Sequence, residues 1–158
     1  MSELISSDQT QFDIKELVSD LNRLLRLRTT PIGMKLFESV KEMEAVPRIR
    51  RPNAIHTTDQ IVGMASRNGW TVGITEADLV GAQCKAVIGL HPRDKEWLSG
   101  ERYRGVWYAD SEDASAHQAA MDVVPFGQFQ AMVVSPLISG RLNPPDICLI
   151  YATPAQMI

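Results

Sequence analysis

The stretch from residue 57 to residue 74, Thr-Thr-Asp-Gln-Ile-Val-Gly-Met-Ala-Ser-Arg-Asn-Gly-Trp-Thr-Val-Gly-Ile, holds a helix and a strand with a stop signal between them. Its apolar residues recur at helical spacing and predict a helix from about Thr57 to Asn68, with Thr58 as its N-cap. Gly69 is a typical residue at a helix end. Trp70 to Ile74 then predicts a strand. A helix followed this closely by a strand predicts a fold that mixes both elements.

The remaining chain continues this mixture without a strict alternation. Asp13 as N-cap and Glu16 in the first turn predict an amphipathic helix over residues 13–28. Residues 84–91 are apolar and fit either a helix or a strand. The other predicted helical segments are 38–45, 92–99 and 111–123, and the predicted strands are 32–37, 103–108, 128–136 and 147–152. This order predicts an α+β or α/β fold, with flanking helices on a mixed sheet.

Length and composition bound the class of protein. The chain has 158 residues, 44% hydrophobic and 22% charged, with a net charge of -3. These values predict one globular domain over 13–158 behind a polar tail, 1–12, and argue against disordered and coiled-coil classes. No apolar run approaches the roughly 20 residues that span a bilayer, and nothing in the charge favours nucleic acid. We therefore expect neither a membrane nor a nucleic acid as partner.

The end of the chain looks like the start of a helix. Thr153 is a suitable N-cap, and Pro154 would occupy the first helical position. We therefore expect an incomplete domain that continues beyond residue 158 in the natural protein.

The two cysteines predict free thiols. Cys84 and Cys148 form neither a disulfide framework nor a Cys-x-x-Cys motif. In the absence of a visible export signal, this predicts a cytoplasmic protein. Cys148 lies in an apolar strand and is expected in the core.

Cys84 is the first candidate for chemistry. A helix that starts near it would lower the pKa of the thiol, so that the thiolate could bind a metal ion or act as a nucleophile. His56, Asp59 and His91 would complete a ligand or metal site if the fold brought them to Cys84. The alternative is a small buried cysteine and capping or exposed histidines.

A second candidate is the basic run between Pro47 and Pro52. Arg48, Arg50 and Arg51 are suited to bind a phosphate or carboxylate, since guanidinium groups form bidentate contacts. A solvated loop or a contact with an acidic partner is the alternative. Four aromatic residues could also line a pocket, although core packing explains them equally well: Trp70, Tyr103, Trp107 and Tyr108. Phosphate-binding Gly-rich loops and the G-x-S-x-G motif are absent.

Several segments in order carry a resemblance to a known family. They are Leu27 to Phe37, Arg67 to Leu79, Cys84 to Leu90, Tyr103 to Tyr108, Ala131 to Leu137 and Pro145 to Met157. From about residue 20 to the end, the chain resembles the uncharacterised ArCR family, domain of unknown function 169.

The resemblance implies a prokaryotic soluble protein, and members are usually longer than this chain. Many members also carry a further cysteine near the start of the helix predicted over 58–68, where this chain has none. A multi-cysteine metal site is therefore in doubt, and Cys84 is the remaining candidate.

Three functions follow as hypotheses. The first is a small-molecule, metal or cofactor binding domain with its site around Cys84. The second is a non-catalytic accessory subunit of a larger bacterial or archaeal enzyme complex, with a homo-oligomer or a partner protein as its context. The third is a cysteine-dependent enzyme, for which no substrate follows from the residues.

Overall fold

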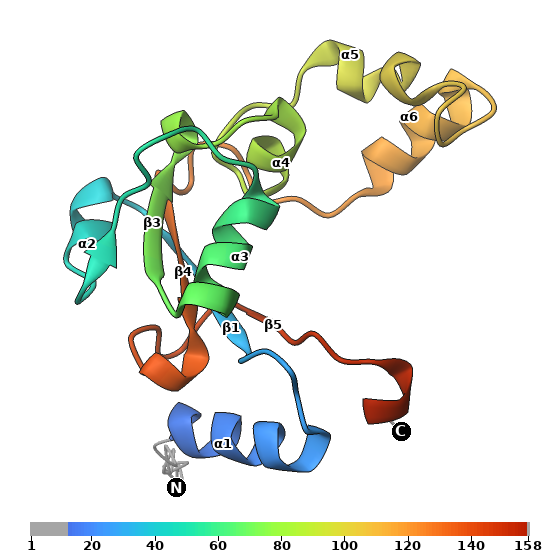
Figure 1. Cartoon of the computed structure of the whole chain (residues 1–158). Coiled ribbons are helices and arrows are strands. Elements are labelled where there is room, and N and C mark those ends of the chain that lie inside the picture. The colour runs from blue at the N-terminus through green and yellow to red at the C-terminus, as the bar shows by residue number, and fades with distance from the viewer. Residues whose placement is uncertain (1–12, 158) are drawn as a thin grey trace, which may run out of the picture.

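A five-stranded sheet forms the centre of the computed structural model, which describes residues 13–157 (Figure 1). The predicted tail, 1–12, lies outside the described residues. The strand order is β2-β3-β4-β1-β5; β2 and β3 are parallel, and all other neighbours are antiparallel. The strands are β1 (Ile32–Phe37), β2 (Ile49–Arg50), β3 (Thr71–Thr75), β4 (Ala131–Pro136) and β5 (Ile147–Leu149).

Six α-helices accompany the sheet within the described residues. They are α1 (Ile14–Leu25), α2 (Val40–Glu44), α3 (Thr58–Asn68), α4 (Ala82–Val87), α5 (Lys95–Leu98) and α6 (Ser111–Ala120). None of these helices has the length and apolar character needed to cross a membrane. The mixed sheet with flanking helices confirms the predicted class and identifies it as α+β.

The core has two parts, one on each face of the sheet. On one face, β4 contributes Met132 and Val134 to a cluster with Ile61 and Ala65 of α3. On the other face, Val133 joins a cluster that α2 covers. The alternation of side chains along a strand explains this division, because successive residues point to opposite faces. Figure 1 shows α3 lying across one face of the sheet.

Local signals determine where α3 begins and ends. The N-cap is Thr57, one residue before the predicted Thr58: its side chain accepts from the Gln60 N–H, and the Gln60 side chain accepts from the Thr57 N–H. This reciprocal pair satisfies two N–H groups that the helix leaves free. At the other end, Gly69 adopts φ 69°, which favours glycine, and β3 begins two residues later.

The helix α1 and the end of the chain are joined by a side chain. Ile14 and Val18 of α1 pack on Leu137, which follows β4. The predicted helix over 13–28 stops earlier, at Leu25, because Arg26 adopts a left-handed conformation. Gln156 then donates from Nε2 to the carbonyls of Leu25 and Arg26, at 2.7 and 2.9 Å, and so caps α1.

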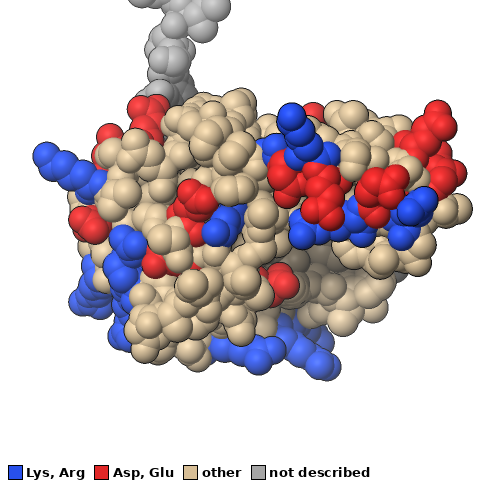
Figure 2. All heavy atoms as spheres, turned by 90° about the horizontal axis from the view of Figure 1, so that it is seen from above, with Lys and Arg blue, Asp and Glu red and all other residues tan. Residues whose placement is uncertain are grey.

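Between β3 and β4 the chain forms a helical lobe of α4, α5 and α6; α5 and α6 stand apart from the sheet, whereas α4 lies close to it, near α3 (Figure 1). The lobe has its own apolar cluster, with Trp97, Tyr103 and Ala114 at its centre. The end of α4 and the segment that returns to β4 meet where the Val124 N–H donates to the Val87 carbonyl at 3.0 Å. On the face seen in Figure 2, acidic and basic side chains lie interspersed, so no field of one sign covers it.

One predicted strand is wrong. Tyr103 to Tyr108 is a closed turn, in which the N–H groups of Val106, Trp107 and Tyr108 all approach the Tyr103 carbonyl at 3.1–3.3 Å. Gly105 at φ 73° allows this turn, and Tyr103 packs into the lobe with Trp107 stacked on its ring at 5.2 Å. Burial of the Tyr103 ring thus overrides the preference of this aromatic segment for a strand.

Other boundaries differ by length. The ambiguous segment 84–91 contains the end of helix α4, and the helix predicted over 92–99 is only the single turn of α5. The last strand ends at Leu149. Cys148, which we expected in the core, is exposed because β5 lies at an edge of the sheet.

Replacement of glycine by alanine should lower the free energy of unfolding by different amounts at two positions in the lobe. Gly100 and Gly105 have φ near 75°, but a Cβ at Gly100 would overlap the Ser111 carbonyl and lie 2.6 Å from the Ser115 nitrogen. At Gly105 that space is open. Gly100→Ala should lower the free energy of unfolding by about 2–4 kcal/mol. Gly105→Ala should cost only about 1–2 kcal/mol. Urea denaturation measures both, and equal losses would contradict the steric argument.

Burial of Tyr103 predicts a loss of stability at high pH. Burial raises the pKa of its phenol above 10.0, so the folded state favours the neutral form. This stabilisation is complete below the pKa of the unfolded chain and is lost as the pH rises through the higher folded-state pKa. The midpoint of urea denaturation should therefore fall more steeply above pH 10 for the wild type than for Tyr103→Phe. Parallel curves for the two proteins would contradict this prediction.

Candidate functional site

A pocket of about 370 Å³ lies beside the parallel pair of strands, β2 and β3, and the N-terminal half of the molecule supplies all of its walls. Its polar lining residues are Arg50, Arg51, Asn53 and His56. Its apolar lining residues include Met64, Trp70 and Val72. None of these described lining residues is acidic. An apolar wall with a few converging polar groups is typical of a small-molecule site.

Arg50 is held at this pocket by an aromatic ring. Its guanidinium carbon lies 4.6 Å from the centre of the Trp70 ring, a cation–π geometry. Within residues 13–157, no carboxylate comes within ion-pairing distance of Arg50. The aromatic contact orients the guanidinium and leaves its charge without a counter-ion from the described chain.

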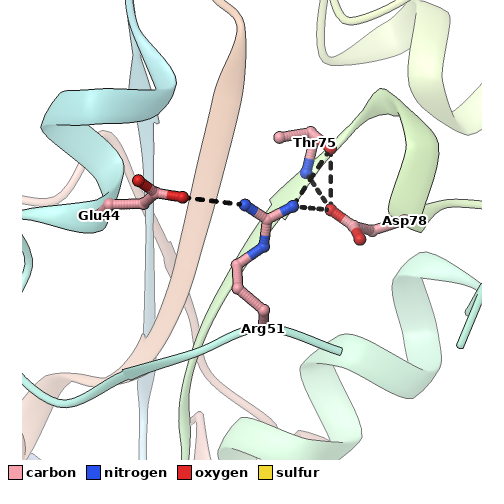
Figure 3. A network of polar contacts seen from close by, with 4 residues as sticks. All are labelled: Glu44, Arg51, Thr75 and Asp78. Atoms are coloured by element: carbon pink, nitrogen blue, oxygen red, sulfur yellow. Dashed lines mark hydrogen bonds and ion pairs between the residues drawn. The ribbon is translucent and has the colours of Figure 1, made fainter. Parts of the chain in front are cut away.

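Arg51, its neighbour, is already neutralised (Figure 3). Its Nη2 donates to Asp78 Oδ2 at 2.7 Å, and its Nη1 lies 3.6 Å from Glu44 Oε1. Asp78 Oδ2 also accepts from the backbone N–H and the hydroxyl of Thr75, each at 2.8 Å. This network connects the segment after β2 to the turn after β3. Arg51 therefore stabilises the wall of the pocket and does not supply an unpaired positive charge to it.

His56 lines the pocket, and its backbone is hydrogen-bonded to the turn that follows β3. Its backbone N–H donates to the Asp78 carbonyl, and its own carbonyl accepts from the Val80 N–H, both at 2.9 Å. The ring Nε2 is buried and has no hydrogen-bond partner among the described residues. The backbone thus positions His56 firmly, while one ring nitrogen is left unsatisfied.

A second, wider pocket adjoins the first along α3. The two pockets share His56 and Met64, and the second adds Asp59, Gln60 and Arg67. The predicted candidates His56 and Asp59 therefore both line the second pocket. His56 also lines the first pocket, together with the predicted residues Arg50 and Arg51. Arg48 precedes β2, adopts φ 58° and does not line either pocket.

The remaining candidates lie elsewhere. Cys84 is an exposed free thiol at the third residue of α4, so the segment that fitted either a helix or a strand is helical at Cys84. His91 Nδ1 lies 2.6 Å from Glu76 Oε1, and this contact occupies one of the two ring nitrogens. Neither residue lines the two pockets beside His56. Residues 13–157 contain no group of three or more His, Cys, Asp or Glu that could hold a metal ion. The structure therefore does not assemble Cys84, His56, Asp59 and His91 into a metal centre.

Three further residues of this region, Asn53, Met64 and Asp78, were not predicted from the sequence. Asn53 and Met64 carry no local signal, because only the folding of α3 against β3 brings them to one pocket. Asp78 does carry a local signal, since Thr75-x-x-Asp78 has the spacing of a capping box. That pattern predicts the turn but not the arginine that binds to it.

The two carboxylates on Arg51 should differ in their effect on stability. Asp78 is the less exposed, at 16%, and accepts three hydrogen bonds, whereas Glu44 is 57% exposed. Asp78→Asn should lower the free energy of unfolding by about 1.5–3 kcal/mol. Glu44→Gln should lower it by about 0–1 kcal/mol. Chemical denaturation at neutral pH measures both, and an equal or larger effect of Glu44→Gln would contradict the assignment.

Comparison with known proteins identifies a family without a known activity. No curated protein and no solved structure matches the chain. The model of one family, described as uncharacterised ArCR, matches residues 20–158. This match covers most of the chain and confirms the resemblance inferred from the sequence motifs. The chain therefore belongs to the uncharacterised ArCR family, domain of unknown function 169.

Proposed function

We propose that this chain is a small-molecule-binding domain, and that its ligand carries a phosphate or carboxylate group. The binding site is the pocket beside His56, and not the surroundings of Cys84. The observation that carries the proposal is Arg50, a cation without a counter-ion in the described chain, oriented by Trp70 at the wall of a pocket without described acidic lining residues.

The arrangement suits the recognition of an anion. Arg50 offers several N–H donors in a plane, which match two oxygens of a carboxylate or phosphate. Asn53 adds an amide at the same wall, and His56 adds a ring nitrogen that is without a partner. A buried polar atom without a partner is costly, so a ligand that satisfies it gains affinity.

The size and the walls of the pocket limit the ligand. A volume of about 370 Å³ is at the lower end of the range for small-molecule sites, which argues for a compact molecule. Met64, Trp70 and Val72 provide apolar contact on the same wall as the cation. We therefore favour a ligand with an anionic group attached to a small apolar or aromatic body.

A cytoplasmic location is part of this proposal. Cys84 and Cys148 are both free and exposed. Exposed thiols persist in a reducing compartment and tend to form disulfides elsewhere.

The proposal predicts an arginine-dependent affinity for anions. Phenyl phosphate combines an anionic group with an aromatic body, and inorganic phosphate tests the anionic group alone. Isothermal titration at low and constant ionic strength should show that phenyl phosphate binds more tightly than inorganic phosphate. Arg50→Ala should weaken the binding of phenyl phosphate by at least tenfold, because it removes the cation.

Arg48→Ala is the matched control. Arg48 has the same charge and lies two residues away, but it does not line the pocket. This variant should bind phenyl phosphate with wild-type affinity. Equal losses for Arg48→Ala and Arg50→Ala would show a general effect of charge and would overturn the proposed site, as would an absence of binding by the wild type.

A further inference from the structure

The two edges of the sheet differ in charge. At one edge, β2 has two residues, and Arg48, Arg50 and Arg51 surround it. Charged side chains on a short edge strand discourage pairing with another strand. At the other edge, β5 begins a stretch without any charge, Ile147-Cys148-Leu149-Ile150-Tyr151-Ala152. Only this second edge offers an uncharged strand for pairing.

Apolar side chains reach this edge and remain exposed there. Ile147 lies opposite Met34 in the register of β1 and β5, so both residues share the face of the sheet that α3 covers. Ile147 is 43% exposed, and Ile150 and Tyr151 beyond it are also exposed. Ile147, Met34 and Met132 line one apolar pocket of about 310 Å³. The apolar surface of the sheet therefore ends at a strand whose outer side pairs with no other strand of the described chain.

We propose that β5 pairs with β5 of a second copy of this chain, in antiparallel orientation about a two-fold axis at Cys148. In such a contact the same segment meets itself. A second copy fits because the segment has no charge: Cys148 then faces Cys148, and Ile147 faces Leu149. The register also places Asp146 opposite Ile150, so it brings no like charges together. The two sheets become one, and the added strand continues the apolar surface past Ile147.

The register makes Cys148 a reporter of this contact. Directly opposed residues of antiparallel strands have Cα atoms about 4.5–5.5 Å apart. A disulfide requires about 4.4–6.8 Å. Cys148 lies opposite Gly33, on the face of the sheet away from α3, so the two thiols would meet on one face. Cys84 is also free and exposed but lies in the helical lobe, and it serves as an internal comparison.

Oxidation by diamide tests the proposal on the whole chain. Two thiols lose two protons and two electrons to diamide, which becomes the hydrazine, and one disulfide forms between the copies. Gel electrophoresis without reductant should show a covalent dimer for the wild type and for Cys84→Ser. Cys148→Ser should not form it. A dimer linked through Cys84, or linking through Cys148 no faster than through Cys84, would overturn the proposal.

Sedimentation tests the contact without the disulfide. The reduced wild type should sediment as a dimer, and Ile147→Lys should shift it towards the monomer by at least tenfold in dissociation constant, because it places a charge at the edge. Val106→Lys is the matched control: Val106 is an exposed apolar residue of the lobe, and its variant should remain dimeric. Circular dichroism confirms that both variants fold. A monomeric wild type at 100 μM, or a dimer that survives Ile147→Lys, would refute the pairing.

Discussion

The pairing of β4 with strands on both of its sides is the constraint on which the fold depends. Every residue of β4 is buried, and its two faces supply side chains to both apolar clusters. β1 and β3 are far apart in the sequence and meet only through β4. Since a slip of one residue would exchange the two faces, the register of β4 is strongly specified. The clusters under α2 and α3 therefore form together, with β4 as their common element.

The pocket beside His56 follows from the short parallel pair at the edge of this sheet. β2 has only two residues, too few to hold its position by backbone pairing alone. Arg51 compensates, because its contacts with Asp78 and Glu44 bind the segment after β2 to the turn after β3 and to α2. Arg50 can then remain free to face the pocket. The two neighbouring arginines thus have different roles. Arg51 pairs with carboxylates and stabilises the segment, whereas Arg50 has no carboxylate partner in the described chain and faces the pocket.

Much of the fold was predictable from the sequence, since its signals are local. The boundaries of β1 were predicted fully, and α3 was predicted to within one residue, because caps, glycines and apolar periodicity specify both. The turn at Tyr103 to Tyr108 was missed because the Tyr103 ring packs into the lobe, which strand preference does not take into account. The exposure of Cys148 was missed because an apolar run does not show whether its strand lies at the centre or the edge of a sheet.

The candidate site was predictable only in part, for a related reason. The arginine run and His56 were identified as residue types, and Trp70 as a possible pocket wall. Their convergence depends on α3 folding back along β3, and on Asp78 taking Arg51 out of the set of free cations. Spacing along the chain does not contain that information. The same limit explains why Cys84 and His56 were grouped although they lie in different parts of the fold.

The neck of the helical lobe has an evolutionary consequence. The chain leaves the sheet after β3 and returns at β4, and the end of α4 at Val87 meets the returning segment at Val124. Gly89 also lies so close to Val124 that a Cβ there would come 2.8 Å from its side chain, so this close approach requires glycine. Because the lobe packs around its own apolar cluster, substitutions at its surface should leave the sheet and its pocket unchanged. Selection can therefore remodel the lobe for new contacts while the pocket beside His56 is preserved.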